Sequence, residues 1–372
     1  MSLANTDNVS KSTGKQVSWQ IKKAVTGNIV PIVFTLLCLV GAVIAEASPI
    51  FLLSSVIIRL ARNLLLVFSL IIPVVTGLGL NFGIVLGAMA AQIALVAVTH
   101  WDIGGLGGFA LAALLSVPLS IVFGWLTGKV LNKAKGNEMI TSMMLGFFAN
   151  GLYQLLFLFV LGGIIPMVNE TIMLPSGIGV KNTVSLKGIK YALDDVLKIG
   201  YETLTIPVFT FIVIALFAFV IKFLLQTKLG QELRCVGQDM NIAATSGIDV
   251  DRMRIIAVIL STVLAAWGQL IHLQNIGILQ TYGSHEQVGL FAVASILIGG
   301  ASVTKATIGQ AVLGTFLFHL LFIISPMAGQ NLVGEPQVGE YFRAFVAYGV
   351  IGVSLGLHAW QKQQAKKHML EE

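Results

Sequence analysis

The sequence predicts an all-α integral membrane protein with about ten transmembrane helices, some broken or re-entrant, and both termini in the cytoplasm. The first observation is composition: 56% of the 372 residues are hydrophobic and only 11% are charged, whereas a soluble domain carries about 25% charged residues. The second is a series of apolar runs, each near the roughly 20 residues that cross a bilayer as a helix. The third is the uneven placement of Lys and Arg along the chain.

Ten apolar stretches are candidate spans. They cover residues 28–47, 63–79, 83–99, 109–131, 139–165, 204–226, 254–274, 287–302, 306–326 and 341–360. The first run is longer than the ~7–15 residues of a cleaved signal core, so we expect it to be retained. The stretches 63–79 and 287–302 are short or interrupted, and eight spans plus two re-entrant segments is the alternative. The membrane region is therefore expected at 28–360, between cytoplasmic tails at 1–27 and 361–372.

The basic residues predict the orientation. With ten spans and a cytoplasmic N-terminus, sixteen of the 23 Lys and Arg residues fall on the cytoplasmic side. This bias obeys the positive-inside rule, and an odd number of spans would place one basic tail outside. The basic residues form no continuous patch, so the net charge of +6 predicts contact with membrane lipid and no nucleic-acid partner.

The polar segment 227–253 is then a cytoplasmic loop. Its apolar residues recur at three- and four-residue steps, as on one helical face. They are Leu233, Val236, Met240, Ala243 and Ala244. Asp239 can cap a second helix, and Gly247 can end it in the left-handed conformation. Two short helices are predicted, at 231–236 and 240–246. We expect a partner protein to cover their apolar face; the alternative is that this face lies on the chain's own spans.

This loop resembles the signature region of ABC-importer permeases of the ribose/nucleoside type. The matching positions are Gly230, Leu233, Arg234, Val236, Gly237, Ala243, Ala244, Gly247 and Ile248. The segment 136–152, "GNEMITSMMLGFFANGL", is similar to the Asn-Glu-Val-Ile-x-Thr-x-Met-Leu-Asn segment of the nucleoside branch, and 296–317 to a late Gly-Gly and Gly-x-x-x-Gly segment. The chain departs from the family at Cys235, at 267–269 and at Gly146, where the nucleoside branch has Asn.

The resemblance implies that the loop contains the coupling helix, which docks on a separate ATP-binding subunit. The coupling residues it implies are Gln231, Arg234, Gly237, Gln238, Asp239, Asn241, Ala243, Ala244 and Gly247. It also implies a second permease, identical or homologous, an extracytoplasmic solute-binding protein and a place in the bacterial inner membrane. The chain carries no G-x-x-x-x-G-K-[ST] motif. We therefore expect no cofactor in this chain, with ATP and Mg²⁺ bound by the partner ATPase.

Polar side chains within the spans predict the solute pathway, because such groups usually face a cavity or a partner. Asn150 and Gln154 lie four residues apart beside Tyr153 and Phe147, and amides with aromatic rings suit a nucleoside or a sugar. The expected pathway residues are Asn81, Phe82, Gln92, Phe147, Asn150, Tyr153, Gln154 and Gln269. Hydrogen bonding between helices is the alternative role.

Four further polar residues are expected outside the pathway. His285 and Glu286 are expected at a solvated rim, with contact to a solute-binding protein as the alternative. His272 is expected at a wetted span end, and His319 has no acidic neighbour in its span for proton relay.

The resemblance therefore implies a non-enzymatic permease subunit that moves a small polar solute inward by alternating access. No catalytic set and no metal-ligand spacing is found within the spans. A nucleoside is the first substrate choice, a pentose or hexose the second, and a ring-bearing vitamin the third. The alternative class is a self-sufficient secondary transporter, which usually needs a buried acid or an ion site. A membrane scaffold without transport activity is the third possibility.

Overall fold

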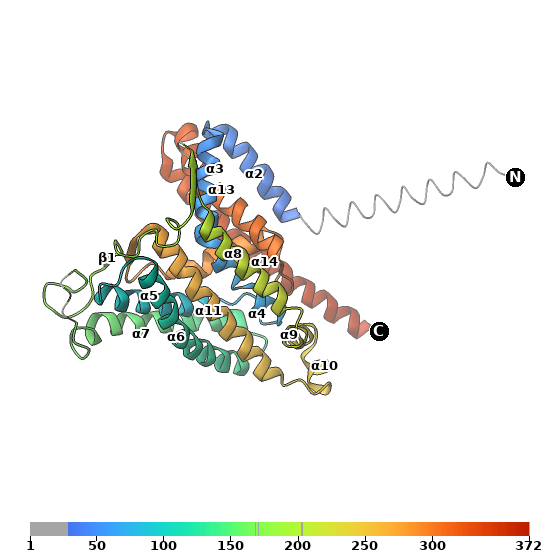
Figure 1. Ribbon diagram of the computed structural model, residues 1–372. Helices are drawn as coiled ribbons and strands as arrows, with labels where there is room; N and C mark the ends of the chain where they lie inside the picture. Colours follow the sequence, from blue (N-terminus) through green and yellow to red (C-terminus); the bar gives the residue numbers. More distant parts are fainter. Residues whose placement is uncertain (1–28, 168, 170, 202–203, 372) are drawn as a thin grey trace.

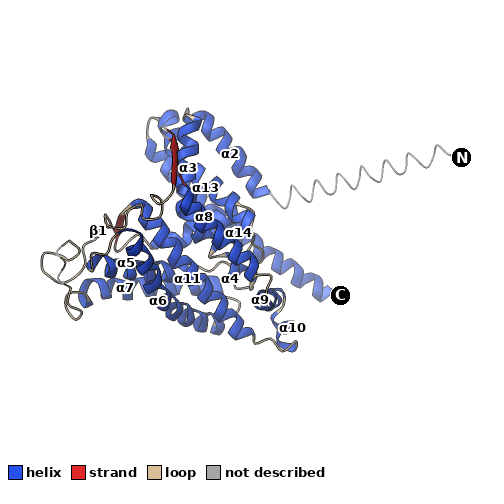
Figure 2. Cartoon of the chain, viewed as in Figure 1, coloured by secondary structure: helices blue, strands red, loops and turns tan. Residues whose placement is uncertain are grey.

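The computed structural model describes residues 29–167, 169, 171–201 and 204–371, and nearly all of its regular structure is helical (Figures 1 and 2). The first half contains α2 (Ile29–Ala45), α3 (Pro49–Phe68), α4 (Ile71–Val75), α5 (Ile84–His100), α6 (Gly105–Lys133), α7 (Glu138–Leu155) and the π-helical turn η1 (Leu156–Val160). The second half contains α8 (Val208–Leu224), α9 (Lys228–Gln238), α10 (Met240–Thr245), α11 (Val250–Ile276), α12 (Glu286–Ile298), α13 (Ile308–Val333) and α14 (Pro336–Glu371).

Four short strands modify the expected all-α fold. They are β1 (Thr183–Ser185), β2 (Lys198–Tyr201), β3 (Leu204–Pro207) and β4 (Ile278–Gln280). Strands β1 and β4 pair antiparallel with Val184 opposite Leu279, and β2 and β3 pair with Ile199 opposite Ile206. Three strands lie in or next to the long connection between the predicted stretches 139–165 and 204–226, where backbone groups need partners that a helix would otherwise supply.

Five helical segments are long and apolar enough to cross a membrane: Pro49–Val75, Gly105–Lys133, Glu138–Val160, Val250–Ile276 and Ile308–Val333. A sixth is counted if α8 and α9, which meet at 73°, form one broken span. Helices α2, α5 and α12 are apolar but shorter. Each of the ten predicted stretches contains a helix, and ten full crossings stay a prediction. The predicted tail at 1–27 lies outside the described residues, whereas 361–371 continues α14.

Helix α11 occupies the centre of the bundle, against α3, α5 and α6, while α13 packs against α2, α3, α12 and α14. Small residues permit the close approach of α11 to its neighbours. A Cβ at Gly87 of α5 would lie 2.3 Å from the Thr262 carbonyl oxygen, and one at Gly124 of α6 would lie 2.7 Å from the Ile259 Cα. The packed core therefore depends on glycine at these crossings.

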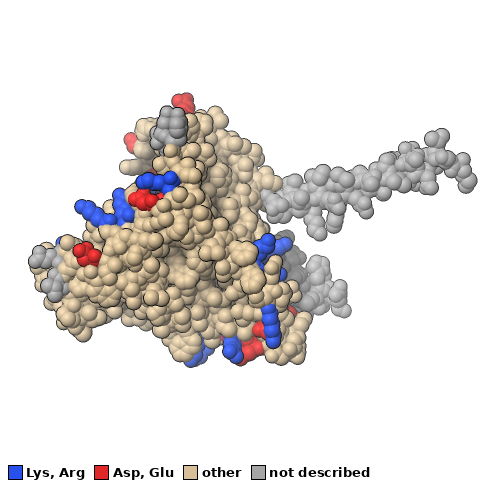
Figure 3. Space-filling model, in the orientation of Figure 1, with Lys and Arg blue, Asp and Glu red and all other residues tan. Residues whose placement is uncertain are grey.

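The two polar regions of interest lie at opposite ends of α11. Helices α9 and α10 precede its first residue, and β4 with the turn at 281–285 follows its last (Figure 1). On the face shown in Figure 3, charged side chains gather at the margins and leave a wide uncharged surface between them. This distribution is typical of a protein whose middle lies in hydrocarbon.

Candidate functional site

Three local features define the loop at residues 227–253, at one end of the bundle. The Thr227 side chain accepts from the Gly230 N–H at the start of α9. The Asp239 Oδ1 accepts from the N–H groups of Asn241 (2.7 Å) and Ile242 (3.0 Å) and so caps α10. Gly247 follows with a φ of 81°. The predicted pair of helices, the cap and the left-handed stop are confirmed, although the first helix begins three residues earlier, at Lys228, and ends two residues later, at Gln238.

The apolar stripe of this loop faces the protein itself. Leu233, Val236 and Ala243 are at most 1% exposed and belong to the main core. Gly237 is equally constrained, because a Cβ there would lie 2.0 Å from the Val75 carbonyl oxygen of α4. The expectation that a partner covers the stripe is wrong for these positions, since α4 and α11 already bury it. Gly237 and Ala243 hold the loop in place and do not face outward.

The outward face of the loop carries the other predicted coupling residues. The exposed ones are Gln231, Arg234, Gln238, Asp239, Asn241, Ala244 and Gly247. Ile242 joins them with 61% of its surface exposed. Ile242 was not predicted because it lies off the stripe, and an apolar residue surrounded by polar ones was the available signal. This face is a mixed polar and apolar surface of the kind that protein interfaces use.

A fully buried arginine anchors the root of the loop. The Arg254 Nη2 lies 2.7 Å from the Glu138 Oε1, and its Nε donates to the Asn132 Oδ1 at 2.8 Å. Nη2 also donates to the Leu131 carbonyl at 3.2 Å, and Nη1 contacts the Met240 Sδ at 3.3 Å. These contacts join α11, α6, α7 and α10. The sequence indicated only that Arg254 and Glu138 lie near span ends, so their pairing depends on the fold.

A hydrogen-bonded network lies at the opposite end of the bundle. The Tyr153 hydroxyl of α7 donates to the Gln92 Oε1 of α5 at 2.7 Å. The His285 Nδ1 lies 3.0 Å from the same oxygen, and its Nε2 lies 2.9 Å from the Asn150 Oδ1. The rings of Tyr153 and His285 are 4.7 Å apart. The network therefore connects α5, α7 and the residue that precedes α12.

The network continues to a carboxylate. The Asn150 Nδ2 donates to the Glu286 Oε1 at 2.9 Å, and the Gln154 Nε2 lies 3.4 Å from the Asn150 Oδ1. His285 is 0% exposed, so the expectation that it lies at a solvated rim is wrong. Folding brings it from the end of a predicted stretch into contact with two amides predicted for the pathway.

A cavity of about 260 Å³ opens beside this network. Its lining includes Phe82, Phe147, Asn150, His285 and Glu286. Aromatic rings, an amide and a carboxylate thus meet in one cavity, which is the usual mixture of apolar and polar groups in small-molecule sites. Three predicted pathway residues line it, and three more, Gln92, Tyr153 and Gln154, contact its wall through the network.

Two predicted pathway residues have structural contacts elsewhere. Asn81 is 2% exposed, and its Oδ1 accepts from the Gly83 N–H at 2.9 Å. The Gln269 Nε2 donates to the Ser284 carbonyl at 3.2 Å and so holds the turn before α12. In the same turn the Tyr282 hydroxyl donates to the Val180 carbonyl at 2.8 Å, and burial raises the pKa of this phenol. Asn81 and Gln269 thus lie outside the lining of the cavity and stabilise the backbone next to it.

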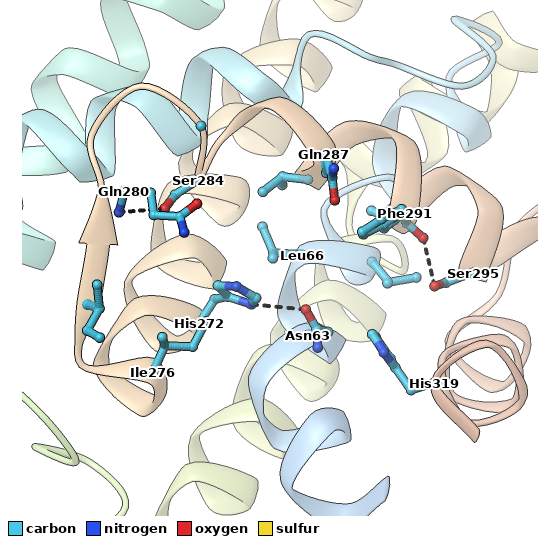
Figure 4. Close-up of a pocket in the computed structure, with 15 residues that line it drawn as sticks. Asn63, Leu66, His272, Ile276, Gln280, Ser284, Gln287, Phe291, Ser295 and His319 are labelled. Atoms are coloured by element: carbon cyan, nitrogen blue, oxygen red, sulfur yellow. Dashed lines mark hydrogen bonds between the residues drawn. The ribbon is translucent and has the colours of Figure 1, made fainter. Parts of the chain in front are cut away.

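A second cavity, of about 390 Å³, lies on the other face of α12 (Figure 4). The labelled polar side chains in it are Asn63, His272, Gln280, Ser284, Gln287, Ser295 and His319. The His272 Nδ1 lies 3.1 Å from the Asn63 Oδ1. His272, expected at a wetted span end, therefore faces an internal cavity. Helix α12 separates two hollows that both contain hydrogen-bonding groups.

The fold and these sites define a multi-pass helical membrane protein with polar cavities between its helices. Among the described residues, no three His, Cys, Asp or Glu side chains converge as metal ligands do. The chain belongs to the family described as "Branched-chain amino acid transport system / permease component", whose model matches residues 52–354. It is therefore a membrane permease, and the resemblance found in the sequence is confirmed.

Part of the chain is also similar to a curated protein. The nucleoside ABC transporter permease protein NupC of Lactococcus lactis subsp. cremoris (strain MG1363) is 29% identical over 151 residues. The match covers 41% of this chain and 45% of that protein. No solved structure matches.

Proposed function

We propose that this chain is the permease subunit of an ATP-driven importer for a small polar solute of the nucleoside or sugar type. The family supplies the transport role. The observation that carries the proposal is the α9–α10 loop, which is fixed on one face and exposed on the other. A separate ATPase subunit, with its ATP and Mg²⁺, binds the exposed face formed by Gln231, Arg234, Gln238, Asn241, Ile242 and Ala244.

Force from ATP-driven closure passes through the buried root of the loop. Met240 of α10 contacts Arg254, and Arg254 pairs with Glu138 at the first residue of α7. Only 17% of the most apolar part of Glu138–Val160 is buried, against 61% for Val250–Ile276. Helix α7 is therefore the element that moves when its first turn is pushed, and α11 is the frame against which it moves.

The solute binds in the cavity beside the His285 network. Asn150 and Glu286 hydrogen-bond its hydroxyl groups, while Phe82 and Phe147 contact its ring. Movement of α7 shifts Asn150, Tyr153 and Gln154 together, which changes the cavity during alternating access. A nucleoside is the favoured solute because the relative's name states nucleoside transport and because ring faces combine here with amides.

The proposed assembly contains a second permease, identical or homologous, and an extracytoplasmic solute-binding protein, in the inner membrane of a bacterium. The exposed outer side of α7 supports the second permease. Met144, Phe147, Phe148 and Leu152 are each at least 54% exposed beside the cavity, and an apolar face next to a solute site suits a pore shared by two subunits.

Co-purification followed by reconstitution tests this function. The expected result is a stoichiometric ATP-binding subunit that travels with the chain, and ATP-dependent nucleoside uptake in liposomes. An Ile242→Asp/Ala244→Asp variant should lose both the ATPase subunit and uptake, because two charges replace the apolar part of the exposed face. The matched control is Ile199→Asp on β2, where the side chain is 62% exposed. Unchanged uptake in the double variant would contradict the docking assignment.

A proton-coupled secondary transporter is the second candidate. The pairing of Glu286 and His285 through Asn150 favours it, because proton relays use such groups. Liposomes that contain the chain alone, with a pH gradient and no ATP, separate the two candidates. We expect no uptake, whereas gradient-driven uptake abolished by Glu286→Gln would favour the second.

A further inference from the structure

A second candidate site lies beside the coupling loop. A cavity of about 530 Å³ opens between α4, α8, α9 and the segment that leads into α13. Three cationic side chains line it: Lys222 of α8, Arg234 of α9 and Lys305. Its lining contains no Asp or Glu. The cavity therefore gathers like charges from three parts of the chain.

These three cations lack partners within the described part of the chain. The ion pairs there join Lys135 to Asp251, Lys198 to Asp195, Lys228 to Glu232, Arg254 to Glu138 and Arg343 to Glu340. All three are exposed, and a cavity lined by charges of one sign attracts ions of the opposite sign. Lys222, Arg234 and Lys305 thus leave a place for a negatively charged ligand.

The floor of the cavity indicates the kind of anion. This floor is the apolar part of the lining, formed by Ile71, Val75, Leu225 and Ile308, and Thr304 and Thr307 add hydroxyl groups. The neighbouring surface of α8 is apolar and open, since Phe219 and Phe223 are 65% and 60% exposed. An anion joined to hydrocarbon chains matches this arrangement: its charged group lies among the cations, and its chains lie along α8.

We infer that this cavity binds a phosphate-bearing anion, and that the phosphate headgroup of an anionic membrane lipid is its source. Basic pockets between membrane helices hold such headgroups. An acidic side chain of a partner protein would neutralise the cations but would leave the apolar floor unfilled. Bound there, the phosphate ties α8, α9 and the segment before α13 together, so the lipid stabilises the loop in its present position.

The test uses the full chain in lipid nanodiscs and in detergent. Native mass spectrometry counts retained phosphatidylglycerol, and thermal unfolding measures protection by phosphatidylglycerol vesicles, phosphatidylcholine vesicles or inorganic phosphate. The Lys222→Gln/Lys305→Gln variant should retain phosphatidylglycerol about 30-fold less well, because each lysine contributes to headgroup attraction. The matched control, Lys129→Gln/Lys133→Gln on α6, removes the same charge and should retain the lipid.

The outcomes distinguish a lipid headgroup from free phosphate as the bound anion. Loss of phosphatidylglycerol in the double variant alone, with no protection by phosphatidylcholine or inorganic phosphate, supports the lipid site. If inorganic phosphate protects the protein as well as phosphatidylglycerol does, and the double variant loses this protection, the phosphate site is supported but a lipid is not its ligand. Equal lipid retention in both variants overturns the inference, as does protection only by an added ATPase subunit. Arg234 also belongs to the face proposed to bind the ATPase subunit, so the variant changes only Lys222 and Lys305. The measurements need no transport and are therefore independent of the proposed import function.

Discussion

Helices α7 and α11 look alike as sequences and differ as parts of the structure. Both are apolar and long enough to cross a membrane, yet 61% of the most apolar part of α11 is buried and only 17% of that of α7. Helix α11 packs against α3, α5 and α6, whereas α7 has few neighbours. Hydropathy therefore identifies a span, but packing decides whether that span lies inside the bundle or on its outside.

The glycines of the two helices show the same difference in packing. A Cβ at Gly268 of α11 would lie 2.8 Å from the Leu66 backbone nitrogen, whereas a Cβ at Gly146 or Gly151 of α7 would meet nothing within 4 Å. Helix α11 has no spare volume where it packs on its neighbour, whereas α7 has open space beside these two glycines. The following changes test how far this contrast extends, from the largest expected effect to the smallest.

The largest effect is expected where the two helices are tied together. Arg254→Met removes the buried cation and leaves Glu138 and Asn132 without their partner, which costs about 3–5 kcal/mol of unfolding free energy. Lys135→Met is the matched control, because Lys135 pairs with Asp251 at 45% and 58% side-chain exposure and such pairs contribute about 0–1 kcal/mol. Thermal unfolding in detergent measures both variants. Equal destabilisation by the two would show that the buried Arg254 contacts do not hold α7 and α11 together.

The next effect is on stability, and a glycine-to-alanine substitution should act differently in the packed helices and in α7. Gly87→Ala places a methyl group 2.3 Å from the Thr262 carbonyl oxygen, and overpacking of this kind costs about 1–3 kcal/mol. Gly151→Ala on α7 meets open space, and alanine favours a helix over glycine by up to about 1 kcal/mol. We expect unfolding temperatures to move in opposite directions. A fall in both would mean that α7 is packed as tightly as the core.

The next effect is on transport and is expected at the cavity. Asn150→Ala removes the amide that contacts His285 and Glu286, so uptake should fall roughly tenfold, as the loss of one hydrogen bond to a charged group predicts. Leu155→Ala, 53% exposed on the same helix, should leave uptake unchanged. Uptake assays in liposomes measure both variants. Similar loss in the two would assign the effect to α7 as a whole.

The smallest effect is local to the loop. Asp239→Ala removes the cap that Asn241 and Ile242 share, which costs about 1 kcal/mol. Hydrogen exchange should rise at the first amides of α10 and stay unchanged in α7 and α11. Asp239→Asn keeps an oxygen acceptor and should preserve protection. Faster exchange throughout α11 would show that the loop and the frame unfold together.

Local chemistry made part of the structure predictable. Asp239 and Gly247 predicted a cap and a stop because both act within one turn of backbone. The ten apolar stretches predicted helices because a buried backbone must satisfy its own hydrogen bonds. The direction of the loop's apolar stripe was not predictable, since Leu233 and Ala243 would be apolar under either a partner or α11.

The sequence by itself determined the membrane class, the family and the residue types available for a polar cavity. Each follows from composition, from spacing within a turn or from a contiguous motif. Only the tertiary structure decided that Arg254 pairs with Glu138, that His285 joins Gln92 and Asn150, and that α7 is largely exposed while α11 is largely buried. These contacts join residues more than a hundred positions apart, and they exist only after the helices pack.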